Sequence, residues 1–184
     1  MARVTLITAR LRIDPPMPAD MQGLCDHVTR NRAHARPWSP AHPDAYYTLG
    51  WWDGWLARVA LDEAREQSLW FLMRLPGDAR IVGSIGLTPI LRGPFQSAQI
   101  GFGLDHDQEG HGLMREGLKA VIAFAFDHLH LHKIVAYHTP DNHRSAATLT
   151  ALGFVAEGLA RNHMEINGIR RDHVMAAVLN VLAE

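Results

Sequence analysis

Two glycines, Gly110 and Gly112, lie between a strand-like stretch and the clearest helical pattern of this 184-residue chain. A strand, a glycine-rich turn and a helix N-terminus together point several backbone N–H groups and the positive end of the helix dipole at one place. Glycine also lets the main chain approach an anion closely, because it has no side chain. The segment Glu109–Met114 therefore predicts a phosphate site, and a tight turn without a ligand is the alternative.

Two nucleotide-binding motifs compete for this pattern, and neither fits. A Walker loop requires lysine and then serine or threonine after its last glycine, whereas Leu113 follows Gly112 here. A dinucleotide fingerprint requires an acidic residue on the next strand, and the next strand-like stretch, Lys133–His138, has none. Nucleoside triphosphate hydrolysis and dinucleotide binding are therefore disfavoured.

The remaining metal-ligating and nucleophilic side chains give weaker patterns. His128, His130 and His132 alternate at a helix end, a spacing that does not place all three on one side, and no cysteine ligand or His-Glu-x-x-His motif accompanies them. Cys25, the only cysteine, lies on an apolar helical face without a paired base. We therefore expect no metal, and we expect Cys25 to pack rather than to react.

The positions of these residues depend on the strands and helices that carry them, and the sequence predicts both kinds of element. Periodicity and turn residues predict strands over Thr5–Ile13, Leu69–Leu75, Arg80–Ile90, Ser97–Leu104, Lys133–His138, Phe154–Ile166 and Ile169–Leu179. They predict helices over Ala19–Arg30, from Gly112 to about Leu129 and over Arg144–Leu152, and an irregular arm, Asn31–Trp55, leading into a helix that ends near Glu66. Asn167-Gly168 favours a type I′ hairpin. The order implies a mixed sheet covered by helices.

Bulk properties favour one globular domain over residues 1–184. Hydrophobic residues make up 47% of the chain and charged residues 20%, close to globular averages. The formal net charge is -1, so no global basic field attracts nucleic acid or an anionic membrane. A lone cysteine excludes an internal disulfide, and no apolar run is long enough for a membrane span or a signal peptide. We expect a soluble, cytoplasmic protein.

Three segments, "EGHGLMREGL", "DNHRSAATLTALGFVAEG" and "INGIRRDHVMAAVL", resemble the GNAT acetyltransferases. The resemblance is strongest to the RimJ/RimL group of ribosomal-protein alanine N-acetyltransferases, with RimJ-type sequences the better match, and "LITARLRI" and "NRAHARPWSP" extend it over nearly the whole chain. It implies an α/β (α+β mixed-sheet) acyl-CoA N-acyltransferase fold, with a central, mostly antiparallel sheet flanked by helices. Glu109 departs from the glutamine or arginine that opens the broad family's loop, and its charge is unfavourable beside a pyrophosphate unless the carboxylate points away.

The resemblance also implies site residues. The acetyl-CoA cosubstrate would be bound by Phe102, Gly103, Leu104, Glu109, Gly110, His111, Gly112, Leu113, Met114 and Asn142, with no metal. Ser145 would lie near the sulfur and donate a proton to the thiolate, so Asn142 and Ser145 are the catalytic candidates, and ordinary helix capping is their alternative. The acceptor groove would be bordered by Asn31, Arg32, Trp38 and Arg92, for which an aromatic mini-core with solvated arginines is the alternative.

The implied activity is direct acetyl transfer to an amine, with the N-terminal α-amine of a ribosomal protein as the expected acceptor. An α-amine has a pKa of about 7.7 to 8.0 and a lysine side chain about 10.4, so the former loses its proton more easily. The base or relay candidates are His138, His163, Glu165, His173 and Glu109. A small-molecule amine acceptor, a non-catalytic acyl-CoA sensor and an interaction module remain alternatives. We expect a monomer or homodimer without a nucleic-acid or membrane partner.

Overall fold

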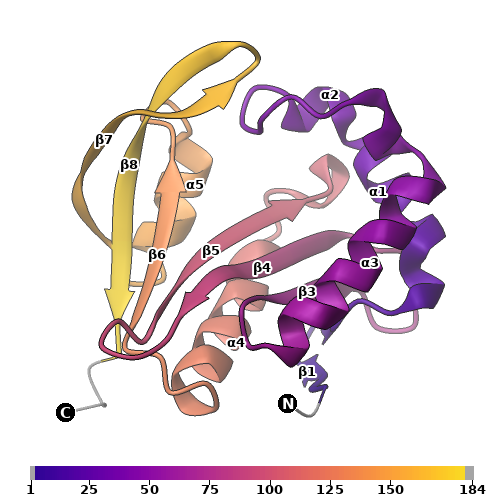
Figure 1. The fold of residues 1–184 in the computed structure, drawn as a ribbon, viewed down its shortest axis with the longest axis horizontal. Helices are drawn as coiled ribbons and strands as arrows, with labels where there is room; N and C mark the ends of the chain where they lie inside the picture. The colour runs from indigo at the N-terminus through magenta and orange to yellow at the C-terminus, as the bar shows by residue number, and fades with distance from the viewer. Residues whose placement is uncertain (1–2, 181–184) are drawn as a thin grey trace.

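A computed structural model describes residues 3–180 and shows one sheet of eight strands in the order β1-β2-β3-β4-β5-β6-β8-β7 (Figure 1). The strands are β1 (Leu6–Ile7), β2 (Arg12–Asp14), β3 (Leu69–Arg74), β4 (Gly83–Leu91), β5 (Ser97–Leu104), β6 (Lys133–His138), β7 (Val155–Ile166) and β8 (Ile169–Leu179). Neighbouring strands are antiparallel except β5 and β6. The predicted mixed, mostly antiparallel sheet is confirmed.

The only parallel pairing among the described strands is short. Ser97, Ala98 and Gln99 of β5 pair with Lys133, Ile134 and Val135 of β6, and the two strands then diverge (Figure 1). On its other side β5 stays paired with β4 as far as Leu104, and β6 stays paired with β8 as far as His138. The sheet is therefore split between the carboxyl halves of β5 and β6.

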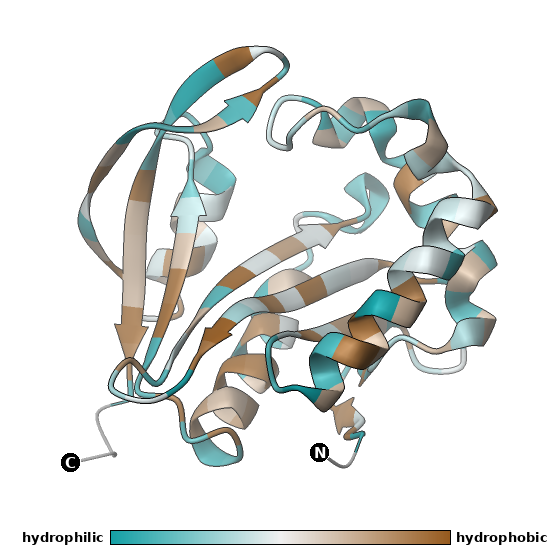
Figure 2. Ribbon diagram, viewed as in Figure 1, coloured by the Kyte–Doolittle hydropathy of each residue, from teal (hydrophilic) through white to brown (hydrophobic). Residues whose placement is uncertain are grey.

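Helices cover both faces of this sheet. They are α1 (Met21–Arg30), α2 (Arg32–Ala35), α3 (Leu49–Ala64), α4 (Leu113–Asp127) and α5 (His143–Thr150), with 3₁₀ turns at Pro18–Asp20, Asp44–Tyr47 and His106–Gln108. Leu118 of α4 and Leu149 of α5 belong to the main core with Phe71 of β3, whereas Leu72 packs with α1 and α3 in a second cluster. Apolar residues alternate along β4 and β5 (Figure 2), as strands packed on a core require.

Two element predictions are wrong. Thr5–Ile13 is a hairpin of β1 and β2 instead of one strand, because Glu116 of α4 accepts hydrogen bonds from the Thr8 hydroxyl at 2.7 Å and the Arg10 N–H at 2.8 Å and holds the turn. The predicted irregular arm, Asn31–Trp55, contains helix α2 and the 3₁₀ turn Asp44–Tyr47 and ends at Thr48, since Trp52 already belongs to the buried stripe of α3. The other predicted elements are confirmed to within a few residues, and the positive φ angles of Asn167 (51°) and Gly168 (79°) agree with a type I′ turn.

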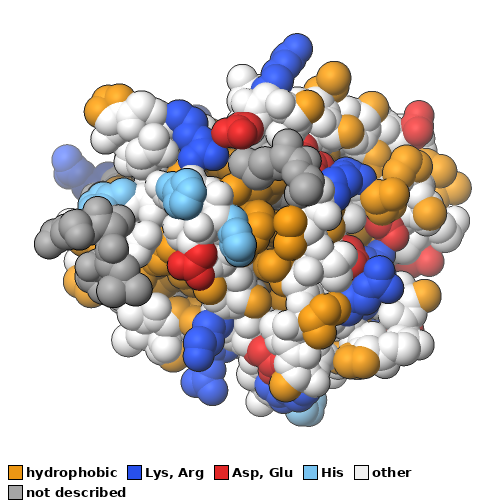
Figure 3. All heavy atoms as spheres, turned by 90° about the horizontal axis from the view of Figure 1, so that it is seen from below, with side chains coloured by type: hydrophobic (Ala, Val, Ile, Leu, Met, Phe, Trp, Pro, Cys, Tyr) orange, Lys and Arg blue, Asp and Glu red, His pale blue; other side chains and the backbone are white. Residues whose placement is uncertain are grey.

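The charge on one face of the molecule and the character of the helices match the near-zero net charge and the average hydrophobic content of the sequence. Seen from below (Figure 3), basic and acidic side chains are interspersed over the face. Within residues 3–180, no helix combines the length and apolar character needed to cross a membrane.

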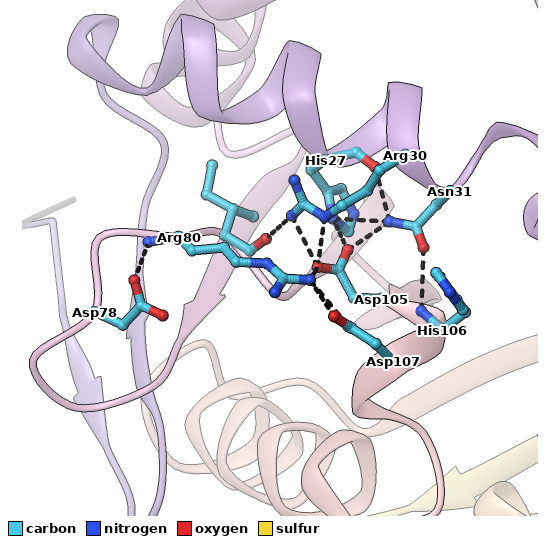
Figure 4. A network of polar contacts seen from close by, with 9 residues as sticks. His27, Arg30, Asn31, Asp78, Arg80, Asp105, His106 and Asp107 are labelled. Atoms are coloured by element: carbon cyan, nitrogen blue, oxygen red, sulfur yellow. Dashed lines mark hydrogen bonds and ion pairs between the residues drawn. The ribbon is translucent and has the colours of Figure 1, made fainter.

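A buried carboxylate joins α1 to the end of β5. Asp105, whose side chain is fully buried, directly follows β5 and accepts hydrogen bonds from His27 Nδ1 at 2.6 Å, Arg30 Nε at 2.8 Å and Arg80 at 2.6 Å, as well as from Asn31 (Figure 4). We call this set of five residues the Asp105 network. It ties the first helix, the segment before β4 and the end of β5 into one unit.

Electrostatics favour the charged form of this carboxyl group. Burial by itself would raise the pKa of Asp105, but the hydrogen bonds from His27, Arg30, Arg80 and Asn31 outweigh burial and hold that pKa well below its usual range. Its stabilising contribution is therefore complete above the pKa of an unfolded aspartate, about 3.9, and is lost as the pH falls through the lower folded-state value.

Replacing Asp105 tests whether the network holds the fold. Asp105→Asn should lower the free energy of unfolding at neutral pH by about 3 to 5 kcal/mol, because it removes a fully buried charge that holds several donors at once, including the partly buried Arg30 and Arg80. Asp107→Asn is the matched control: Asp107 also pairs with Arg80, at 2.7 Å, but its side chain is 43% exposed, so about 1 kcal/mol or less is expected. Urea unfolding measures both variants. The deficit of Asp105→Asn should shrink below about pH 4, and equal deficits in the two variants would refute the assignment.

Candidate functional site

A cavity of about 450 Å³ lies beside the split in the sheet. Its walls come from the end of β5, the loop into α4, the start of α5, and α2 with the turn after it. Of the residues predicted from sequence, those that line it are Trp38, Phe102, Gly103, Leu104, Glu109, Gly110, Gly112, Met114, Asn142 and Ser145. The structure thus brings most of the predicted cofactor residues together with both catalytic candidates.

The β5 wall of this cavity offers main-chain hydrogen-bonding groups. Phe102, Gly103 and Leu104 pair with Ile85, Ser84 and Gly83 of β4 on one edge. The pairing with β6 ends at Gln99, so the other edge faces the split. Gly103 is exposed and Phe102 and Leu104 are half-buried, so an extended ligand can reach the backbone N–H and C=O groups of this edge and pair with them as an added strand would.

The loop before α4 is shaped by its two glycines. Gly110 and Gly112 have φ angles of 78° and 75°, in the left-handed region that glycine adopts without strain. Gly112 is the N-cap of α4, and no side chain caps that helix. The first N–H groups of α4 are therefore left for an anion. Leu113 is buried in the core, while the carbonyl of His111 accepts a hydrogen bond from Arg10 at 2.9 Å; neither of these two residues lines the cavity by its side chain.

The carboxylate of Glu109 contacts side chains from two other elements. Arg144 at the start of α5 forms an ion pair with it, and His34 Nε2 of α2 lies 2.8 Å from its Oε1. We call these three residues the Glu109 cluster. Because Arg144 supplies a positive charge, Glu109 does not face the loop N–H groups as an unpaired negative charge.

Three basic residues on the other side of Gly112 were not singled out from the sequence. Arg10, Arg115 and Lys119 line a neighbouring cavity of about 500 Å³ together with Gly112. Arg115 lines both cavities. Arg115 and Lys119 could have been predicted from the sequence, because they lie one helical turn apart directly after the two glycines. Arg10 could not be found that way, since only the β1–β2 hairpin brings it to the loop.

Asn142 and Ser145 have the geometry of a helix cap and also line the cavity. Asn142 is the N-cap of α5, and its Oδ1 accepts a hydrogen bond from the Ser145 N–H at 3.1 Å. The capping interpretation is thus present in the structure. It leaves the Ser145 hydroxyl free to act on a ligand, because the cap uses only the backbone of Ser145.

The predicted acceptor residues separate into different places. Trp38 lines the cavity. Asn31 is buried in the Asp105 network, and Arg32 lies over the ring of Tyr47 at 4.2 Å, where it also pairs with Asp44. Arg92 follows β4 at the opposite end of β5, bound to the Leu129 carbonyl at 2.6 Å and to Glu66. The structure does not bring Asn31, Arg32 and Arg92 to the cavity, because each is held by other partners.

Comparisons with known proteins agree with the geometry. The sequence matches the family described as Acetyltransferase (GNAT) domain over residues 10–155. It is 32% identical over 179 residues to the ribosomal protein uS5-alanine N-acetyltransferase of Escherichia coli, across 96% of this chain and 91% of that protein. It is 35% identical over 155 residues to the probable N-acetyltransferase YjcK of Bacillus subtilis, across 83% and 84% of the two chains.

A solved structure gives the same result for the fold. The ribosomal-protein-S5-alanine acetyltransferase of Vibrio fischeri superimposes with a TM-score of 0.94 at 29% identity, over 98% of this chain and 99% of that one. The resemblance drawn from the glycine loop and the Asn142 segment is thereby confirmed. With the family match extending over more than half of its length, the chain belongs to the GNAT acetyltransferase family.

Proposed function

We propose that this protein transfers the acetyl group of acetyl-CoA to the N-terminal α-amine of a ribosomal protein. The observation that carries the proposal is the open edge of β5 next to the Gly110–Gly112 turn. An extended chain of amides that ends in phosphates, as in CoA, matches these two features in order. The acceptor class is supported by the relatives from Escherichia coli and Vibrio fischeri, whose names state ribosomal-protein alanine acetylation.

The donor would follow the two cavities. Its pantetheine arm would pair with Phe102–Leu104, and its pyrophosphate would accept N–H groups from His111–Met114 at the start of α4. The basic residues of the neighbouring cavity, Arg10, Arg115 and Lys119, would attract the remaining phosphate of the nucleotide end.

The transfer itself requires an amine that attacks and a thiolate that leaves. The amine nitrogen attacks the thioester carbonyl carbon, and the C–S bond breaks as the tetrahedral intermediate collapses. Ser145, on the α5 wall of the cavity, would donate a proton to the departing thiolate. Asn142 would act with it, because its cap fixes the start of α5.

An α-amine is the acceptor that this site can deprotonate most easily. Its pKa of about 7.7 to 8.0 leaves roughly a tenth of the amine neutral at pH 7, whereas a lysine side chain at about 10.4 is almost entirely charged. The tip of the β7–β8 hairpin is joined to the segment after α2 by the Asn167 side chain, which donates to the Arg36 carbonyl at 2.7 Å. Such a link would hinder a folded surface from reaching the split more than it would hinder a chain end.

The function test compares acceptors in one assay. With acetyl-CoA and a peptide that has an N-terminal alanine and one internal lysine, we expect thiol release and acetylation of the α-amine, located by mass spectrometry. A matched peptide with a blocked N-terminus should not react. Transfer only to a small-amine panel would contradict the proposal, and so would CoA binding without thiol release, which would indicate a sensor.

Lys119 tests the placement of the nucleotide end. Lys119→Gln should weaken CoA binding about fivefold, because one exposed charge contact is worth about 1 kcal/mol, and should leave binding of 3′-dephospho-CoA unchanged. Isothermal titration calorimetry measures both ligands. Lys133→Gln is the matched control, since Lys133 is the other lysine of the chain and pairs with Glu157 on β7. Equal losses for the two ligands would contradict the placement.

The Glu109 cluster gives a double-mutant prediction. Arg144→Gln should weaken CoA binding about fivefold, because it removes the arginine charge that balances the Glu109 carboxylate beside the phosphates. Glu109→Gln should keep or improve the affinity, and the double variant should return to the value of the wild type. The same calorimetric titration measures all three variants. A loss in Glu109→Gln as large as that in Arg144→Gln would show that Glu109 contributes to binding instead of needing neutralisation.

A further inference from the structure

The ladder between β7 and β8 is interrupted beside the split. Ala160 pairs with His173 and Met164 pairs with Arg171, so residues 161–163 of β7 oppose the single residue Asp172 of β8. Asn162, inside this bulge, has a φ of 50° and donates its N–H to the Asp172 carboxylate at 2.8 Å. Bulges of this kind re-aim a side chain and are common next to active sites.

The bulge aims His163 across β8 onto a residue of β6. Its ring stacks on Tyr137 with the centroids 4.4 Å apart and the planes 16° apart. The same ring meets His173 of β8 edge-on, at 5.2 Å and 61°. His163 is exposed, Tyr137 is half-buried, and His173 is 4% exposed. Three strands therefore contribute one ring each to what we call the His163 cluster.

This cluster lies at the split, on the face opposite α5. Tyr137 belongs to the part of β6 that has lost its pairing with β5. Ala136, its neighbour, is buried in the main core with Leu149 of α5, and successive side chains of a strand point to opposite faces. Ser145 and the His163 cluster thus approach the split from opposite sides.

The buried member of the cluster is suited to hold a neutral ring. Burial lowers the pKa of His173, only partly opposed by the Arg171 carbonyl, which lies 3.1 Å from its Nδ1. Because a carbonyl oxygen only accepts, Nδ1 carries the proton and the other ring nitrogen keeps its lone pair. The charged and titratable groups around the cluster are Tyr137 and His138 of β6 and Arg171 and Asp172 of β8.

We propose that His163 is the proton acceptor for the amine, with Tyr137 and His173 as positioning residues. This inference rests on the proposed function. The acceptor enters as an ammonium and passes one proton to the His163 imidazole, which releases it to water. The freed lone pair forms the C–N bond at the thioester carbonyl. When the C–S electron pair leaves on sulfur, the nitrogen passes its second proton to water, the CoA thiolate takes the proton of the Ser145 hydroxyl, and water returns a proton to Ser145.

The other base candidates are less suited by their surroundings. The Nδ1 of His138 faces the Thr139 carbonyl at 2.9 Å, and its side chain has the parity of Ala136, on the α5 face. Glu109 is paired with Arg144. Glu165 lies nearer the hairpin tip, directly opposite Arg170.

The pH dependence of transfer tests the assignment. With acetyl-CoA and the N-terminal alanine peptide, His163→Gln should lower kcat/KM at neutral pH about 100-fold. The loss should diminish as the pH rises above the pKa of the α-amine, about 7.7 to 8.0, where the acceptor arrives neutral. KM for acetyl-CoA should stay unchanged. Imidazole in the buffer should partly restore His163→Ala.

Two further variants separate catalysis from folding. Tyr137→Leu should lower kcat with an unchanged KM for acetyl-CoA, and its pH profile should shift. His132→Gln is the control, an exposed histidine beside the opposite end of β6, and should match the wild type. Transfer by the wild type with an unaltered rate and pH profile in His163→Gln would overturn this inference alone, whereas no transfer by the wild type would overturn the proposed function with it.

Discussion

The short ladder between β5 and β6 is the constraint on which the site depends. Two parallel strands that continued side by side would satisfy each other's backbone groups. Here pairing stops after Gln99 and Val135, and each strand remains held by its antiparallel neighbour. The strands therefore part without losing their own support. The free edge of β5, the start of α5 and the Tyr137 ring on β6 all obtain their positions from that divergence.

Asp105 keeps one side of the split fixed. The residue stands at the point where β5 ends and the loop to α4 begins, and its partners His27, Arg30 and Asn31 come from α1 and its C-cap. Asn31 also accepts a hydrogen bond from the His106 N–H at 3.1 Å, which carries the network into the loop. A carboxylate that is buried at this point needs several donors at once. The helical layer on that face is consequently positioned by the same group that ends the cofactor strand.

Sequence patterns predicted the local elements and the order of the site segments. The apolar stripe of α4, the alternation of β5 and the Asn167-Gly168 turn each depend on neighbours within a few residues, and such signals are readable in one chain. The Asp105 network could not be read, because it joins residues near 27, 80 and 105 that only the folded chain brings together. The same limit applies to Arg10, and to Arg92, whose partners Leu129 and Glu66 are distant in sequence. The bulge at Asn162 could not be predicted either, because the adjacent residues of β7 include no glycine or proline.

The donor and the acceptor require different charges on the two sides of the split. The donor brings phosphates, so its side of the site needs cations and loop N–H groups, and Glu109 is tolerated there because Arg144 neutralises it. The acceptor brings an ammonium, so its side needs a neutral ring that can take a proton, and a cation there would oppose the amine. Burial lowers the pKa of His173 and so favours a neutral ring beside His163. Placing the two requirements on opposite faces of a divided sheet keeps the cations that bind phosphate away from the amine that must lose its charge.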